Sequence, residues 1–353
     1  MKKLLSAALA LLMALSMLTA CGSGDTVPEE ASGGSEDEVL TLRTCTQSPD
    51  TNINTIVTRY FAERVSELSE GKMEIEVYIN AELGSEQSVM EQVLTGTLEM
   101  APISTSLLAN VVPETGIYSL PFLFPTMESY VGVTGDPAFQ EIVFNAINEQ
   151  TGAVCLGGIT CIGRGVANKN RPIETVDDLK GLKIRTIGSS AINDAFEAMG
   201  ATVTSVAWKE VYTALQQGLC DGEDSTVNSN LSMKFIEYNN YFTELNEIFQ
   251  DQLLLVNGGV WAGLTAEQQS ILTQAAKETF EYGMDYTAQY RQEGFDEAAA
   301  EYPDFQIIKR EDISDEDYAT FYDAATSVWP EYVEKIGQDL FDLTIDLVEQ
   351  YSE

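Results

Sequence analysis

Apolar and polar positions in the first third of the chain repeat with the periods of strands and helices. Leu40 and Leu42 alternate with the polar residues Thr41 and Arg43, which predicts a first strand. Apolar residues then recur every three or four positions from Ile53 to Leu68, which predicts an amphipathic helix that stops at Gly71. The next predicted elements are a strand over 73–79, a helix over 86–95 and a strand over 98–103. This β-α-β-α-β order predicts a parallel sheet with helices on its faces, because right-handed crossovers bring successive strands side by side.

A second α/β unit is predicted further along the chain. Pro121 and Pro125 disfavour a helix over 119–125, so a loop is predicted there. The sequence then predicts a helix over 126–149 and a strand over 153–159. The unit itself alternates a strand over 182–186, a helix over 190–199, a strand over 202–206 and a helix over 208–217.

Two later segments complete the predicted architecture. The apolar run 253–256 predicts a strand that returns to the first unit. A helix is predicted over 265–301, where Thr265 and Gln268 form a capping box at its start. The part of the chain after residue 38 is about 315 residues long and exceeds the ~250–300 residues that a single core usually serves. We therefore expect two lobes.

The N-terminus has the pattern of a lipoprotein signal sequence. Lys2 and Lys3 precede an apolar run over 4–17, which is too short for a membrane span of about 20 residues. Residues 18–21 read LTAC and fit a lipobox, so we predict a signal peptide over 1–20 and a lipid on Cys21 that tethers the protein to the cell membrane. An ordinary signal peptide with a chance cysteine is the alternative.

The segment after the predicted lipid anchor is polar and acidic. Up to residue 38 it contains mostly Gly, Ser, Asp and Glu, so 21–38 is predicted to be a flexible acidic linker. The whole chain has a formal net charge of −37, which repels nucleic acid and excludes it as a partner. The same charge repels carboxylates, so a site for an organic acid needs local positive charge.

Cysteine and histidine usage narrows the chemistry further. The four cysteines after Cys21 have the spacing of neither a disulfide framework nor a zinc site, and we expect buried thiols. They are Cys45, Cys155, Cys161 and Cys220. The chain contains no histidine, which excludes Ser-His and Cys-His nucleophilic catalysis and histidine-based metal sites. We predict no cofactor and no metal.

Arg185 is the residue best placed to bind an anion. It follows the apolar residues Leu182 and Ile184 by strand alternation, so its head lies at the carboxyl end of a predicted strand, where open α/β sheets bind ligands. A guanidinium offers two parallel N–H donors that match a carboxylate. A surface ion pair with one of the many acidic residues is the alternative.

Three motifs resemble the solute-binding proteins of TRAP transporters, the DctP-like family. They are LPFLF at 120–124, DLKGLKIR at 178–185 and EVYTALQQGLCDG at 210–222. The resemblance implies an α/β fold like that of periplasmic binding proteins, with two α/β lobes around a ligand cleft and a long helix that spans both lobes. It assigns 39–160 and 251–290 to lobe I, and 161–250 and 291–353 to lobe II.

The resemblance also implies roles for particular residues. Arg185 matches the arginine that clamps the substrate carboxylate in the family, Arg164 resembles a second pocket arginine, and Trp208 stands where an aromatic residue covers the solute. A surface turn for Arg164 and simple packing for Trp208 remain alternatives.

The chain departs from the family pattern after Gly222. Ser225 occupies the place of an asparagine that contacts solute, and Asn228 follows three residues later. A hydroxyl makes fewer hydrogen bonds than an amide, which leaves the identity of the ligand open. Thr46 and Ser104, at loop tips of lobe I, are weaker candidates for contacts to the other end of the solute.

The sequence therefore predicts a lipid-anchored receptor outside the cytoplasm that is not an enzyme. It would capture a small carboxylate and deliver it to a TRAP permease with a small and a large membrane subunit. A sensor that presents the solute to a signalling partner is one alternative. A lipid-anchored hydrolase that uses Asp or Glu residues is another, although the chain has no G-x-S-x-G nucleophile motif.

Overall fold

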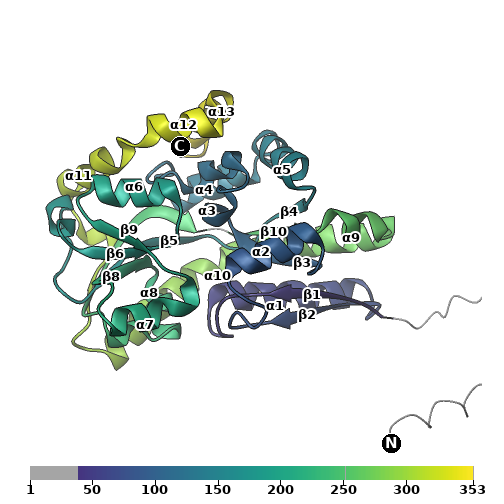
Figure 1. Ribbon diagram of the computed structural model, residues 1–353, viewed down its shortest axis with the longest axis horizontal. Coiled ribbons are helices and arrows are strands. Elements are labelled where there is room, and N and C mark those ends of the chain that lie inside the picture. The colour runs from purple at the N-terminus through teal and green to yellow at the C-terminus, as the bar shows by residue number, and fades with distance from the viewer. Residues whose placement is uncertain (1–38, 251, 353) are drawn as a thin grey trace, which may run out of the picture. The chain divides into compact units, whose positions relative to one another are not determined.

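The computed structural model of the protein describes residues 39–250 and 252–352 (Figure 1). The predicted signal peptide, Cys21 and the acidic linker lie outside these residues. The strands are β1 (Leu40–Cys45), β2 (Met73–Tyr78), β3 (Met100–Ser104), β4 (Val154–Gly158), β5 (Ile162–Asn168), β6 (Lys183–Thr186), β7 (Thr202–Ser205), β8 (Gly222–Ser225), β9 (Tyr241–Gln250), β10 (Gln252–Val256) and β11 (Gln306–Ile308).

Helices and strands are interspersed up to β10, and mostly helices follow it. They are α1 (Ile53–Leu68), α2 (Glu86–Thr95), α3 (Thr105–Leu108), α4 (Met127–Gly135), α5 (Pro137–Thr151), α6 (Ser190–Ala198), α7 (Val211–Gln216), α8 (Val227–Ser232), α9 (Gly258–Gly263), α10 (Ala266–Glu301), α11 (Asp315–Thr326), α12 (Trp329–Ile336) and α13 (Gln338–Tyr351). No helix within the described ranges is both long and apolar enough to cross a membrane.

The first lobe contains two small sheets. β1 and β2 pair in parallel with α1 between them in the chain, as the sequence predicts. The prediction that the 98–103 strand joins a parallel sheet is wrong, because β3 pairs antiparallel with β10, which also pairs antiparallel with β4. All five residues of β10 are buried, so this returning strand has paired neighbours on both sides and forms the centre of the sheet.

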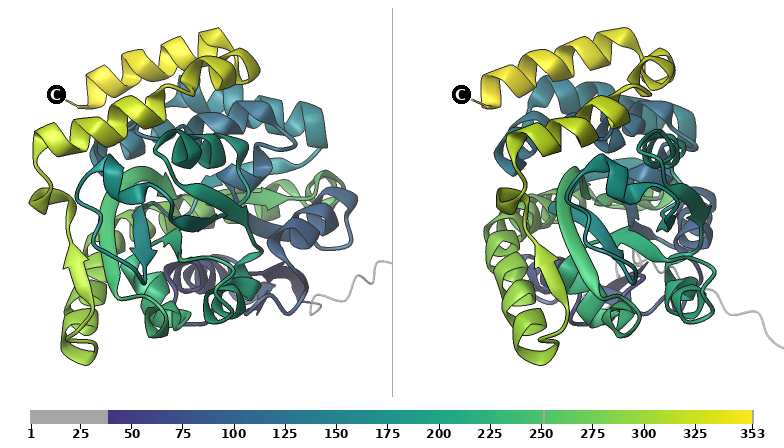
Figure 2. Two further views of the ribbon diagram at one scale, coloured as in Figure 1. Left: turned by 60° about the vertical axis from the view of Figure 1, so that its left-hand side comes forward. Right: turned by 90° about the vertical axis from the view of Figure 1, so that its left-hand side faces the viewer.

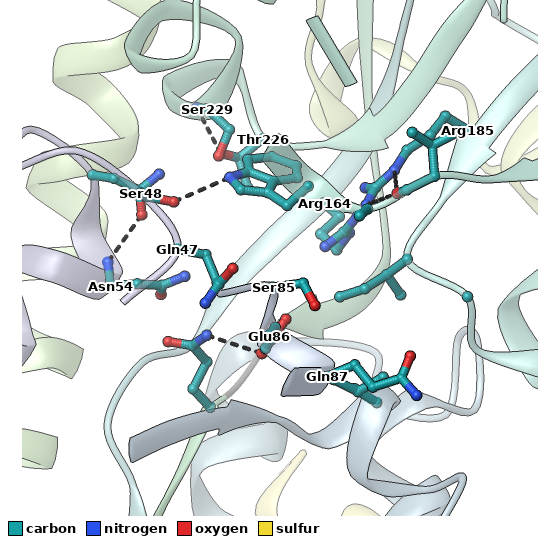
Figure 3. A pocket seen from close by; sticks show the side chains of 18 of the residues that line it. Gln47, Ser48, Asn54, Ser85, Glu86, Gln87, Arg164, Arg185, Thr226 and Ser229 are labelled. Atoms are coloured by element: carbon teal, nitrogen blue, oxygen red, sulfur yellow. Dashed lines mark hydrogen bonds between the residues drawn. The ribbon is translucent and has the colours of Figure 1, made fainter. Parts of the chain in front are cut away.

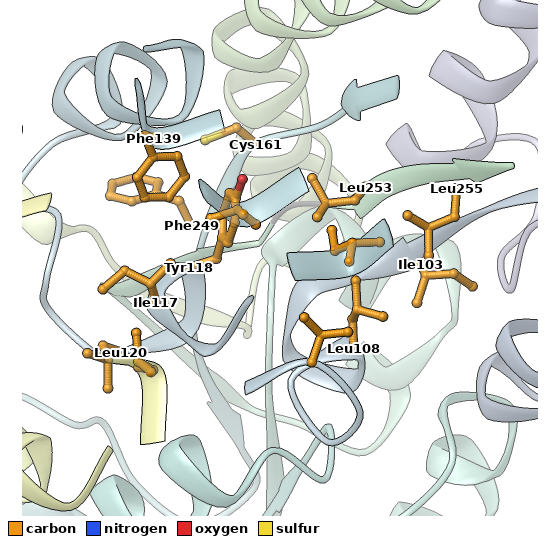
Figure 4. Packing of buried hydrophobic residues seen from close by; sticks show 14 of the residues in the cluster. Ile103, Leu108, Ile117, Tyr118, Leu120, Phe139, Cys161, Phe249, Leu253 and Leu255 are labelled. Carbon is orange, nitrogen blue, oxygen red and sulfur yellow. The ribbon is translucent and has the colours of Figure 1, made fainter. Parts of the chain in front are cut away.

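Apolar side chains from distant parts of the chain form the core of the first lobe (Figure 4). Ile103 of β3 lies opposite Leu253 of β10, and both are fully buried. Phe139 from α5 packs its ring edge against Tyr118 at a centroid distance of 5.3 Å. This core fixes the strand ends that carry one wall of the site.

The predicted helix over 126–149 is two helices. α4 ends before Asp136, and α5 begins at Pro137 with the Asp136 side chain accepting from the Ala138 N–H. Proline disfavours a helical conformation in the residue before it and has no N–H to continue a helix, so the chain turns here.

The second lobe is built on a six-stranded mixed sheet in the order β11-β9-β5-β8-β6-β7. The predicted strands over 182–186 and 202–206 form β6 and β7, which pair in parallel. The predicted helix over 208–217 starts as a 3-10 turn, Trp208–Glu210, before α7. β5 runs antiparallel to both β8 and β9, which places Arg164 in the middle of the sheet.

The long helix α10 runs along both lobes, as predicted. The capping box of Thr265 and Gln268 is present at its start. Leu272 packs in the same cluster as Val57 of the first lobe, and Phe295 packs with Phe242 of the second lobe. The fold is thus an α/β fold with two lobes, as the sequence predicts.

The C-terminal helices are drawn in yellow along the top of both views in Figure 2. Their side chains belong to the cores of both lobes. Phe321 of α11 packs in the cluster of the second lobe with Phe196 of α6, whereas Leu347 of α13 packs in the cluster of the first lobe. The residue ranges that the sequence analysis assigns to the two lobes stay a prediction.

Candidate functional site

A cavity of about 290 Å³ lies between the two lobes (Figure 3). This volume is at the lower end of the range for ligand pockets, about 300–1,000 Å³, and suits a small molecule. The first lobe contributes the loop after β1, the starts of α1 and α2, and β10, and the second lobe contributes β5 and the segments after β6 and β7. Its polar lining residues are Gln47, Ser48, Asn52, Asn54, Ser85, Glu86, Gln87, Asn110, Arg164, Arg185, Ser205, Thr226, Ser229 and Gln252.

Arg185 lies in the wall of this cavity, on β6, and is only 2% exposed. Its Nε and Nη2 both donate to the Val206 carbonyl oxygen, at 2.9 and 2.7 Å. Nη1 has no hydrogen-bond partner, and Arg185 forms no ion pair with any residue that the structure describes. A buried, unpaired charge costs free energy, and an anionic ligand would reduce that cost, so this guanidinium is the main candidate for binding an anion.

The electrostatics of Arg185 agree with this geometry. Burial and the positive charge of Arg164 lower the pKa of Arg185 to about 10. The side chain is therefore still charged at neutral pH. Its guanidinium carbon lies 5.3 Å from the centroid of the Trp208 ring, a cation–π contact that orients the plane of the group.

Arg164 also lines the cavity, but it has a counter-ion. Its Nε donates to Asp224 Oδ1 at 2.7 Å, and its Nη2 donates to the main-chain oxygen of Asp224. Burial lowers the pKa of Arg164, and the charge of Asp224 more than offsets this, so the pKa is raised. Burial and the neighbouring Asp224 charge raise the pKa of Glu247 well above its ordinary value. Of the two arginines in this wall, Arg164 has an ion-pair partner, whereas Arg185 has none among the described residues.

The glycines beside Arg164 are required by close packing of β5 against β9. A Cβ on Gly165 would lie 2.2 Å from the Thr243 carbonyl oxygen, and a Cβ on Gly163 would lie 2.0 Å from Asn246 Oδ1. A plain surface turn, the alternative for this segment, is wrong because Arg164 lies within a central strand and is buried.

Trp208 closes the cavity from the second lobe. Its indole Nε1 donates to Ser48 Oγ of the first lobe at 3.1 Å, and its ring packs edge-on against Phe235 with centroids 5.2 Å apart. It thus lines the cavity, packs on the core and links the lobes. The proposed role of covering the solute stays a prediction.

The two candidates from the first lobe lie next to the cavity without lining it. Thr46 Oγ1 is hydrogen-bonded to Thr55 Oγ1 at 2.8 Å, and both are buried. The main-chain N–H of Ser104 donates to Glu86 Oε1 at 2.7 Å, while Ser104 Oγ is buried without a partner. Ser104 therefore positions a lining residue.

Ser225 and Asn228 of the second lobe also lie outside the cavity lining. Ser225 Oγ donates to Glu223 Oε1 at 3.2 Å, and Asn228 Nδ2 donates to the Tyr290 carbonyl oxygen of α10 at 2.6 Å. The polar lining from this segment comes from Thr226 and Ser229. Direct contacts of Ser225 and Asn228 with a ligand stay a prediction.

Several residues that line the cavity were not predicted from the sequence. The most important is Glu86, because it is the acidic residue of the lining. It is the first residue of α2, with Ser85 as the N-cap. The rule that ligands bind beyond the carboxyl ends of strands already pointed to the segment between β2 and α2 and could have identified Glu86. Gln252 had no such signal, because it lies in β10, whose pairing the sequence did not reveal.

The cysteine prediction is confirmed in part. No disulfide joins the four cysteines of the described chain. Cys45, Cys161 and Cys220 are buried, whereas Cys155 is half-buried.

Comparison with known proteins places the chain in a family. The sequence profile of "Bacterial extracellular solute-binding protein, family 7" (DctP) matches residues 45–336, most of the chain. A "Solute-binding protein" of Verminephrobacter eiseniae is 31% identical over 220 residues, which is 62% of this chain and 64% of that protein. The "C4-dicarboxylate-binding protein DctB" of Bacillus subtilis is 28% identical over 291 residues, 81% of this chain and 80% of that protein.

A solved structure supports the same fold. The crystal structure of the sugar acid binding protein DctPAm from Advenella mimigardefordensis, in complex with galactonate, superposes with a TM-score of 0.83. It shares 22% sequence identity and covers 89% of this chain and 99% of that one. The chain therefore belongs to the DctP family of extracellular solute-binding proteins that serve TRAP transporters, a family of binding proteins and not of enzymes.

Proposed function

We propose that this chain is the lipid-anchored solute-binding subunit of a TRAP transporter, located outside the cytoplasm. It binds a small organic acid in the cavity between its lobes and delivers it to the small and large membrane subunits of the permease. The observation that carries the proposal is the buried guanidinium of Arg185. It lines the cavity, and none of the described residues forms an ion pair with it.

The donors of Arg185 determine how a carboxylate is held. Nε and one N–H of Nη2 are used by the Val206 carbonyl. The remaining fork consists of Nη1 and the second N–H of Nη2, and its two parallel N–H groups match the two oxygens of a carboxylate. Val206 and the Trp208 ring hold this fork before the ligand arrives, so little side-chain entropy is lost on binding.

Arg164 gives the same wall a second guanidinium, although Asp224 neutralises it. Its role is to polarise the wall and to donate a hydrogen bond to a further ligand oxygen. Because the protein carries a net charge of −37, anions bind only where such local cations are shielded from the rest of the surface.

Calorimetric titration of the purified full chain with a panel of organic acids tests ligand binding, and no detectable heat of binding with any acid contradicts the proposal. Uptake of a labelled acid that binds, by cells with and without the gene for this chain but with the permease genes intact, tests delivery. Equal uptake by the two strains contradicts the transport role and favours the sensor alternative.

A further inference from the structure

The cavity is electrically asymmetric from one wall to the other. Arg164 and Arg185 lie on one side, and Glu86 and Gln87 lie on the opposite side (Figure 3). Glu86 forms no ion pair with either arginine or with any other cation in the described chain. The two charges are nevertheless close enough to interact, because the positive charge of Arg185 lowers the pKa of Glu86, although burial outweighs this and the pKa is raised.

The Glu86 carboxylate is fixed in place with one oxygen still available. Its Oε1 accepts from the Ser104 N–H at 2.7 Å and from Gln252 Nε2 at 3.5 Å. Both hydrogen bonds end on Oε1, which leaves Oε2 to accept from a ligand. In its ionised form the Glu86 carboxylate accepts hydrogen bonds and donates none, so the group that it pairs with is a donor.

Side-chain amides surround this acidic end. Gln47, Gln87, Asn110 and Gln252 line the cavity together with Glu86. Gln252 Oε1 is buried without a hydrogen-bond partner, so it is a second acceptor to which a ligand can donate. Amides both donate and accept, as hydroxyl groups do, whereas a second ligand carboxylate offers acceptors alone.

From this layout, and on the basis of the proposed function, we infer that the ligand is a hydroxylated monocarboxylate and not a dicarboxylate. Its carboxylate binds Arg185, and a hydroxyl near its other end donates to Glu86 Oε2. A dicarboxylate of similar length would bring its second negative charge towards Glu86, where the cavity lining offers no cation.

Acids of matched length test the inference. Succinate, D-erythronate and 4-aminobutanoate each have four carbon atoms and carry, at the end away from one carboxylate, a carboxylate, a hydroxyl and an ammonium group. Adipate and D-galactonate form a six-carbon pair. Titration of the full chain should give affinities at least about tenfold higher for the hydroxy acid of a pair than for the dicarboxylate, since one well-placed polar contact has that effect or more.

The possible results separate this inference from the proposed function. Equal or tighter binding of succinate or adipate than of the hydroxy acids overturns the inference and leaves the proposed function standing. Tightest binding of 4-aminobutanoate also overturns it, because the donor would then be an ammonium group. If none of the five acids binds, the inference fails, whereas the proposed function fails only if no acid of the wider panel binds either.

A variant pair tests the role of Glu86 directly. Glu86→Gln removes the charge at the start of α2, whereas Glu128→Gln removes an exposed glutamate from the first turn of α4. We expect Glu86→Gln to reduce the preference for D-erythronate over succinate by about tenfold or more, and Glu128→Gln to leave it unchanged. An unchanged preference in Glu86→Gln overturns the inference. The comparison of ligands on the unaltered chain stands even if Glu86→Gln folds poorly.

Discussion

Replacement of Arg185 tests the centre of the proposed site. Arg185→Ala removes the unpartnered Nη1, the two donors to Val206 and the cation–π contact with Trp208. Truncating one partner of a buried, charged hydrogen-bonded pair typically costs about 2–5 kcal/mol of binding free energy. This corresponds to a loss of affinity of roughly thirty- to several-thousand-fold.

The folded state of the Arg185→Ala variant should remain close to the original in stability. The Val206 carbonyl loses its donors, which costs about 1–3 kcal/mol if water does not replace them. Removal of an unpaired buried charge offsets part of this cost, as the lowered pKa of Arg185 indicates. Arg185→Lys keeps a charge but loses the planar fork, so it should bind with intermediate affinity.

Calorimetric titration of an acid that binds the unaltered chain measures the effect, with thermal unfolding as the check on folding. Arg59→Ala is the matched control, because Arg59 is an exposed arginine paired with Asp50. The control should bind with unchanged affinity. Undiminished affinity in a folded Arg185→Ala variant would refute the assignment of Arg185 as the carboxylate ligand.

Three further predictions concern the anchor, the cleft and the pH dependence of stability. Cys21→Ser should release the protein from the membrane fraction, and retention of the variant after a high-salt wash would contradict the lipid anchor. Trp208→Phe removes the hydrogen bond to Ser48 but keeps an aromatic ring, so titration should show roughly two- to tenfold weaker binding, and unchanged binding would mean that this link does not favour the liganded state. Burial raises the pKa of Glu223 in the folded state from 4.5 to about 7. The folded state therefore binds the proton more tightly than the unfolded state does. This contribution to stability, about 3 kcal/mol, is complete below pH 4.5 and is lost as the pH rises through 7. Urea unfolding at pH 5 and pH 8 should show this loss, and Glu223→Gln should make it smaller; an equal loss in the variant would refute the role of Glu223.

The acidic network around Glu223 shows how the protein tolerates this buried carboxyl group. Asn239 Nδ2 donates to Oε2 at 2.8 Å, and Asn230 Nδ2 donates to Oε1 at 2.8 Å. These donors lower the pKa of Glu223 but do not fully offset burial. The group therefore titrates near neutrality.

Local patterns in the sequence were enough to predict individual helices and strands and the main candidate for anion binding. The apolar repeat from Ile53 to Leu68 predicted α1, and the capping box at Thr265 predicted the start of α10, because helix periodicity and capping depend on residues a few positions apart. Strand alternation placed Arg185 at the carboxyl end of β6 for the same reason. Pro137 also indicates the break between α4 and α5, but the apolar pattern continues on both sides of it, so one helix was predicted.

Long-range packing brings together the groups that line the cavity. β10 takes the centre of the first-lobe sheet between strands that are far away in the chain, and no local pattern specifies that pairing. Asp224 neutralises Arg164 because two antiparallel strands pair in one register, and this leaves Arg185 as the unpaired cation. Glu86 faces the arginines only because the two lobes enclose one cavity. The sequence thus predicted the cation that we propose as the carboxylate ligand, whereas long-range packing determined the charge and hydrogen-bonding groups at the opposite end of the site.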